Sequence, residues 1–164
     1  MSAAEPAAYI EDNRRELSRM RAIVAALTDD ELALAVNESW TVAGVLGHIA
    51  FWDGRVLALG GKVQRNVPFT ESDTEPEDVD WINDASSPLL HAIPVRAAAE
   101  LALRIAEDTD RLVTELPRER MWPDDPGSPI TAPRASHRGE HLDEVEQALR
   151  GHGISIDAEG RRVR

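Results

Sequence analysis

The sequence predicts an all-α fold, and more specifically a four-helix bundle. Four long segments repeat apolar residues at intervals of three and four positions, which places those residues on one face of a helix. No segment alternates apolar and polar residues strongly enough to compete as a strand. With 164 residues the chain is long enough to bury a core of its own, so we expect residues 1–164 to form one domain.

The first helix is predicted over residues 7–27, where charged side chains lie off an apolar stripe. The stripe comprises Ile10, Leu17, Met20, Val24 and Leu27. Thr28 and Glu31 then have the spacing of a capping box, which predicts a short helix that continues to Ala35.

The second helix is predicted to begin after Thr41, a suitable N-cap, with Trp40 packed onto Val45. Gly60-Gly61 is expected to end it. Its apolar residues are Val45, Leu46, Ile49, Trp52, Val56 and Leu59. His48 shares the otherwise apolar face that contains Val45 and Trp52.

Residues 62–94 show no helical period. Six of the ten residues from Glu71 to Asp80 are acidic, and a solvated loop is the favoured interpretation of that part. A few apolar side chains interrupt the remainder, and we expect them to pack over the core as short helical turns. They are Trp81, Ile82, Leu89 and Leu90.

The third helix is predicted over residues 95–116. Pro94 is well placed at its start, and Pro117 is expected to stop it. The residues expected to face inward are Ala98, Leu101, Ile105, Leu112 and Leu116.

A proline-rich connection follows over residues 118–133, with Trp122 as its expected anchor. The fourth helix is predicted over residues 131–150, and residues 154–164 are expected to form a loosely held tail. The inward residues of the fourth helix are Leu142, Val145 and Leu149. The long segment 60–94 could cross the end of the bundle and join two parallel neighbours.

Charge and composition exclude several classes of partner. The net charge of −12 disfavours nucleic acid and anionic membranes, because both need compensating lysine and arginine. Residues 1–13 carry neither a basic start nor an apolar run typical of a secretory signal, and no segment approaches the length of a membrane span. We therefore expect a cytoplasmic protein that binds neither nucleic acid nor membrane.

Three histidines form a candidate metal site. His137 and His141 are four residues apart, so they share one face of the fourth helix, and His48 could supply a third ligand. The chain has no cysteine, so any metal must be held by nitrogen and oxygen atoms. Solvated or core-packed histidines are the alternative, but each lies on the apolar side of its helix, where an unpartnered imidazole is costly to bury.

These residues carry a resemblance to a known family. Trp40-Thr41, Leu46-x-His48 and Trp52-Asp53, followed by His137-x-x-x-His141 on the last helix, resemble the motifs of the DinB-like (damage-inducible) four-helix metalloproteins. The resemblance implies that His48, His137 and His141 are both the metal ligands and the catalytic residues. It also implies bound zinc or nickel, an up-down-down-up helix order and a homodimer.

Characterised members of the family include thiol-dependent S-transferases and the mycothiol-dependent maleylpyruvate isomerase, whose additional C-terminal domain is not expected in this chain. Three histidines leave a fourth coordination position open, as catalytic metal sites do. A metal there could activate water, or bind and deprotonate a low-molecular-weight thiol such as mycothiol, which would attack a small electrophilic substrate. The alternatives are a hydrolase, a non-catalytic bundle that uses metal for structure or binding, and a family member that has lost its metal.

Other residues near the motifs have weaker interpretations. Asp53 and Glu140 could orient a ligand or act as a base, but exposed helical acids are the favoured interpretation. Trp52 could line the site or simply pack in the core. Arg55 or Arg134 could bind a substrate carboxylate. The remaining two histidines, His91 and His152, have no partner at ligand spacing and are expected to be exposed.

Overall fold

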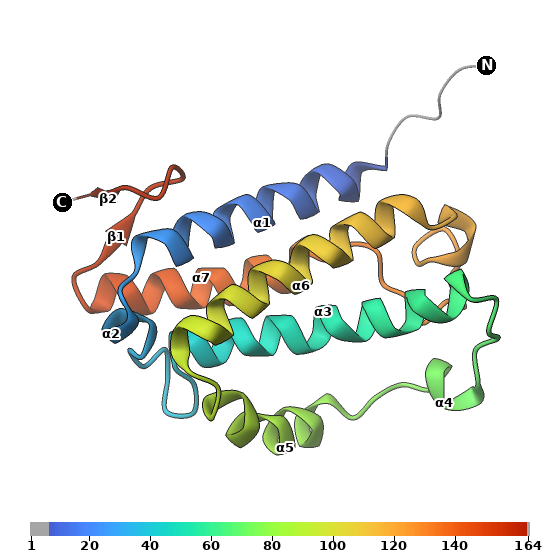
Figure 1. Cartoon of the computed structure of the whole chain (residues 1–164), viewed down its shortest axis with the longest axis horizontal. Coiled ribbons are helices and arrows are strands. Elements are labelled where there is room, and N and C mark those ends of the chain that lie inside the picture. The colour runs from blue at the N-terminus through green and yellow to red at the C-terminus, as the bar shows by residue number, and fades with distance from the viewer. Residues whose placement is uncertain (1–6, 164) are drawn as a thin grey trace.

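Four long helices lie alongside one another and make up the body of the protein (Figure 1). The computed structural model describes residues 7–163. Residues 1–6 and 164 lie outside this range, although the expected single domain includes them and the expected absence of a secretory signal concerns residues 1–6 as well. The long helices are α1 (Ala8–Ala26), α3 (Val42–Gln64), α6 (Val95–Glu115) and α7 (Ala135–Gly151). In Figure 1, α1 and α7 run towards one end of the molecule and α3 and α6 run towards the other. The all-α prediction is confirmed.

Short elements connect and flank the long helices (Figure 1). They are α2 (Asp29–Leu32), α4 (Glu71–Thr74), α5 (Val79–His91), the 3₁₀ helix η1 (Arg118–Arg120), and strands β1 (Ser155–Ile156) and β2 (Arg162–Val163). The strands pair antiparallel, so the end of the chain is a small hairpin and not the loose tail expected. Asp157 stabilises its turn by accepting hydrogen bonds from the backbone of Glu159 and Arg161, and Arg162 forms an ion pair with Glu31.

The predicted helix starts are largely confirmed. Thr28 and Glu31 form the capping box of α2, and Thr41 caps α3 by accepting a hydrogen bond from the Gly44 N–H at 3.1 Å. Pro94 immediately precedes α6. These side chains satisfy or avoid backbone N–H groups that have no partner within their own helix.

Small residues bring α3 and α6 together in the most extensive helix contact of the fold. On α6, Ala98, Ala102 and Ala106 are fully buried, whereas Leu101 and Ile105, expected to face inward, are half-buried. Gly60 does not end α3 as predicted. A Cβ at this position would lie 2.3 Å from Leu112 Cδ2, so Gly60 is needed for the packing of α6. The glycine permits close packing inside a helix that continues to Gln64.

Three other sequence predictions are corrected. The segment 79–91 forms the continuous helix α5, in which Trp81 and Leu89 are 61% and 72% exposed and do not pack on the core. The fourth helix begins at Ala135, because residues 130–132 are held extended by backbone hydrogen bonds to Trp122. Trp122 itself is 44% exposed; the connection is anchored by the buried side chains of Met121 and Ile130.

Within residues 7–163, α3 is the one helix long and apolar enough to cross a membrane. Its most apolar window is 67% buried inside the protein, since α2, α5, α6 and α7 pack on it. Its composition is therefore explained by its central position in the fold.

Candidate metal centre

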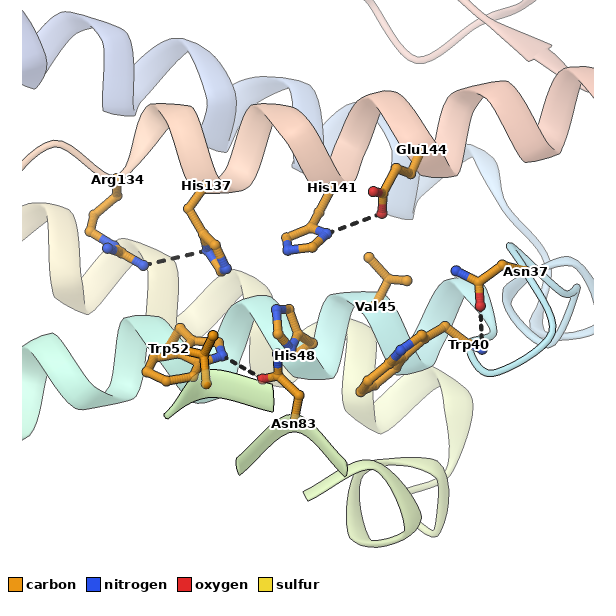
Figure 2. A pocket seen from close by; sticks show the side chains of 11 residues that line it. Asn37, Trp40, Val45, His48, Trp52, Asn83, Arg134, His137, His141 and Glu144 are labelled. Atoms are coloured by element: carbon orange, nitrogen blue, oxygen red, sulfur yellow. Dashed lines mark hydrogen bonds and ion pairs between the residues drawn. The ribbon is translucent and has the colours of Figure 1, made fainter. Parts of the chain in front are cut away.

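The three predicted histidines come together between α3 and α7 (Figure 2). His48 is on α3, and His137 and His141 are one turn apart on α7. One potential ligand nitrogen from each ring lies within 4.8 Å of the other two. The ring centroids of His48 are 5.3 Å from His137 and 4.6 Å from His141. The sequence therefore identified a real cluster.

The protein environment keeps two of the three histidines neutral. Burial, together with the neighbouring His141, lowers the pKa of His48 to about 4. Burial and the positive charge of Arg134 lower the pKa of His137 to about 3. Both imidazoles are thus available as neutral nitrogen donors at physiological pH.

The donor set suits a divalent metal. The Nδ1 atom of His141 lies 3.1 Å from a Glu144 carboxylate oxygen, the arrangement that commonly orients a metal-binding histidine. His48 Nδ1 is buried, with no hydrogen-bond partner among the described residues, and a buried polar atom of this kind is costly unless a ligand meets the ring. Three nitrogens without a fourth protein ligand in the cluster match the open sites of zinc enzymes.

A cavity of about 480 Å³ opens beside the histidines. Trp40 and Trp52 form aromatic walls, and the Trp52 indole N–H donates to Asn83 on α5 at 3.1 Å. Trp52 therefore lines the site, one of its two predicted roles, and Trp40 lines it as well. The other lining residues are Asn37, Val45, Val79, Arg134 and Glu144.

A second cavity, of about 500 Å³, borders the first at Trp52, Val79 and Arg134. Arg55 lines this second cavity and not the first; its guanidinium donates to Glu77 at 2.7 Å and to the Pro129 carbonyl at 2.9 Å.

A buried ionic network lies beneath the histidines. Asp53 accepts from Arg134 Nε at 2.8 Å through one carboxylate oxygen and from Arg138 Nε at 2.9 Å through the other. Arg138 also contacts Asp110, whose pKa is raised chiefly by burial. Asp53 is fully buried, so its interpretation as an exposed acid is wrong, whereas Glu140 is exposed as expected.

Asn13 on α1 fixes the start of α7. Its side-chain oxygen accepts from the backbone N–H groups of Arg134 and Ala135, at 2.7 and 2.9 Å, and its amide donates to the Ala132 carbonyl at 2.9 Å. Arg134 supplies no side-chain cap of its own, so a residue more than 100 positions away satisfies these donors. This fixes the first turn of α7, which carries His137.

The two histidines outside the cluster are exposed, as expected. His91 nevertheless has a structural role, since its Nε2 accepts from the backbone N–H of Thr41 at 3.3 Å and its ring lies over Gly44. His152 Nε2 lies 3.3 Å from the Ala35 carbonyl.

The helical body and the shared ligand nitrogens define an all-α protein with a candidate three-histidine metal site. The family model of the DinB superfamily matches residues 13–150, which is most of the chain. The chain belongs to the DinB superfamily, and the resemblance seen in its sequence motifs is confirmed. No curated protein and no solved structure is similar enough to be matched to it.

Proposed function

We propose that this protein is a metal-dependent enzyme that transfers a low-molecular-weight thiol to a small electrophilic substrate. The observation that carries the proposal is that three histidine nitrogens border a cavity of about 480 Å³ and have no fourth protein ligand in their cluster. A structural metal site is normally closed by four protein ligands, whereas a catalytic site keeps one position for substrate.

The residues around the cavity have separate tasks in this proposal. A divalent ion such as zinc or nickel, held by His48, His137 and His141, would favour the ionised form of a thiol or water. Glu144 keeps a proton on Nδ1 of His141 and leaves Nε2 as the donor. Trp40 and Trp52 supply apolar walls that exclude water from the reacting groups.

In the proposed reaction the thiol loses its proton to solvent and its sulfur forms a bond to an electrophilic carbon. A leaving group departs with the electrons of the bond that breaks. The thiol must come from a cosubstrate, since the chain has no cysteine. Metal-dependent hydrolysis at the same position is the close alternative and needs no thiol, and a non-catalytic metal-binding role is the second.

Metal content tests the site itself. We expect purified protein to contain about one divalent ion per chain, and His48→Ala, His137→Ala and His141→Ala each to lose most of it. His152→Ala is the matched control, because this histidine is exposed and outside the cluster. Elemental analysis of the five proteins is the measurement. Metal retained by all three site variants would contradict the proposal.

Activity tests distinguish the chemical alternatives. A panel of bacterial thiols, mycothiol included, is incubated with a chromogenic electrophile and the metal-loaded protein. Turnover that requires both the thiol and His48 supports the transferase. Product release without thiol supports the hydrolase, and stoichiometric metal with neither activity supports the non-catalytic role.

The proposal extends to the whole chain. We propose a single domain in the up-down-down-up order, supported by the helix directions in Figure 1 and by the superfamily match. We also propose a cytoplasmic homodimer that binds neither nucleic acid nor membrane, in line with the net charge of −12 and the family resemblance. Sedimentation equilibrium of the purified protein tests the dimer.

A further inference from the structure

Among the described residues, Arg134 is the one arginine or lysine that lines the cavity beside the histidines. It lies at the start of α7, borders both cavities and has a side chain only 8% exposed. Its Nε donates to Asp53, and its Nη2 lies 3.4 Å from Nδ1 of His137 (Figure 2). Arginine has only donors, so His137 Nδ1 accepts in this contact.

Metal coordination by His137 is incompatible with that contact. A neutral imidazole has one nitrogen with an available lone pair and one nitrogen that carries a proton. If a metal takes Nδ1, the lone pair that faces Arg134 is used. If a metal takes Nε2, Nδ1 must carry the proton and meets the arginine N–H as a second donor. In both cases the Nη2 group of Arg134 loses its acceptor.

Arg134 keeps its position and its positive charge when its Nη2 group loses this acceptor. Asp53 still holds Arg134 through Nε, at 2.8 Å. The carboxylate of Asp53 is shared with Arg138, so it neutralises neither guanidinium completely. Asp110, the other acid in the network, contacts Arg138 and not Arg134. The network has two guanidiniums and two carboxylates, but both carboxylates contact Arg138 and only Asp53 contacts Arg134, so the excess of positive charge lies at the Arg134 end, beside the histidines.

We propose that Arg134 is the anion-binding residue of this site, and that the ligand is a thiol with an anionic group a few bonds from its sulfur. The inference rests on the proposed thiol binding at the metal and adds the class of ligand. The anionic group would accept the hydrogen bond from Arg134 Nη2 that His137 Nδ1 no longer accepts, as carboxylates and sulfonates commonly do with arginine. Arg134 thereby selects anionic thiols over neutral ones.

A pair of matched thiols tests this selection. The protein is loaded with cobalt(II), whose absorption spectrum changes when a thiolate binds, and titrated with 2-mercaptoethanesulfonate and with 2-mercaptoethanol. The first carries a sulfonate where the second carries a neutral hydroxyl, and sulfonate is a poor metal ligand. We expect the wild-type protein to bind the sulfonate at least about tenfold more tightly, which corresponds to 1.4 kcal/mol.

Substitutions then assign the preference to a residue. Arg134→Gln should remove the preference while the dissociation constant for 2-mercaptoethanol stays within about twofold, and Arg134→Lys should keep part of it. Arg55→Gln is the control, because Arg55 lines only the second cavity, and it should keep the full preference. The unchanged affinity for the neutral thiol shows that each variant retains an intact site.

The outcomes separate the two proposals. Equal binding of both thiols by the wild type overturns the role of Arg134 and leaves thiol binding intact, as does a preference that survives in Arg134→Gln. Loss of the preference in Arg55→Gln would assign the anion to the second cavity and also overturn the inference. If neither thiol changes the cobalt spectrum, the proposed transferase itself fails.

Discussion

Asp53 is the residue on which the buried part of the site depends. It is fully buried between the guanidinium groups of Arg134 and Arg138, which come from the last third of the chain. A buried ion pair of this kind adds little net stability compared with apolar packing, but loss of one partner leaves an uncompensated charge. Asp53 therefore matters most as the only carboxylate that both arginines share in the described residues.

Replacement of Asp53 by asparagine should destabilise the protein strongly. Two buried guanidinium groups would lose their shared counter-charge, at a cost of about 3–5 kcal/mol, which lowers Tm by roughly 6–20 °C. Asp108→Asn is the control, because the Asp108 side chain is 53% exposed and pairs with Arg111 on the surface; its effect should stay within about 0.5 kcal/mol. Thermal unfolding followed by circular dichroism measures both. A loss below about 1 kcal/mol in Asp53→Asn would show that the network is not held by this carboxylate.

The neutral histidines predict a specific loss of stability in acid. In metal-free protein the pKa values of His48 and His137 are about 4 and 3, below the usual value of 6.5 in the unfolded chain. Below pH 6.5 the unfolded state therefore binds protons that the folded state does not. The free energy of unfolding should fall as pH drops from about 6.5 towards 4, by at most about 1.4 kcal/mol per pH unit for each histidine.

Urea titrations of chelator-treated protein between pH 7 and pH 4 measure this slope. His137→Gln should reduce it, since the variant has one fewer buried imidazole, and His152→Gln should not, because His152 is exposed. An identical slope in the wild type and His137→Gln would contradict the assignment.

His137 and His141 were identifiable from sequence because their spacing is that of one helix face. Among the polar residues that support the site, Arg138 and Asn13 were missed and Asp53 was expected to be exposed, although a signal was present. Asp53 continues the buried stripe of Ile49 and Val56, and Arg138 continues that of Leu142 and Val145. A charge on an apolar stripe predicts a buried partner on another helix. Which helix supplies it cannot be read from one segment, since the pairing depends on how the helices pack.

At the level of elements, the glycines of α3 have two different roles. A Cβ at Gly54 would meet no other atom within 4 Å, whereas a Cβ at Gly60 would lie 2.3 Å from Leu112 and 3.2 Å from Leu116. The sequence alone presents both as helix-weakening residues, which is why Gly60-Gly61 was read as a terminator. Whether a glycine weakens the helix or permits close packing depends on the residue that it faces. For Gly60 this residue is Leu112, 52 positions away on α6.

Alanine substitutions should therefore act in opposite directions. Gly54→Ala should stabilise the protein by up to about 1 kcal/mol, because alanine favours the helix and fits without a clash. Gly60→Ala gains the same propensity but overpacks the contact with Leu112, for a net loss of about 1 kcal/mol. The midpoints of urea unfolding report both changes. Equal shifts for the two variants would contradict the close packing of α3 on α6.

The connections were harder to predict than the long helices. The first, second and third long helices and their caps follow from periodicity and from single residues such as Thr41 and Pro94. Helix α5 did not, because Trp81 and Leu89 point to solvent and Pro88 lies inside the helix. Its formation depends on contact with α3, which a local pattern does not contain.

For the whole molecule, α5 is the part of the site attached most lightly. Its main contacts are with α3, yet it supplies Asn83 and Val79 to the cavity that contains the histidines. A segment with so few tertiary contacts opens at a fraction of the free energy of global unfolding. Backbone amides of residues 83–91 should therefore exchange with deuterium well before those of α3 and α6, and a ligand that bridges the histidines and α5 should slow them. The rate at which α5 separates from α3 would then limit how fast such a ligand enters and leaves. The residence time of the ligand would depend on α5, whereas the rate of the chemical step would depend on α3 and α7, which carry the histidines.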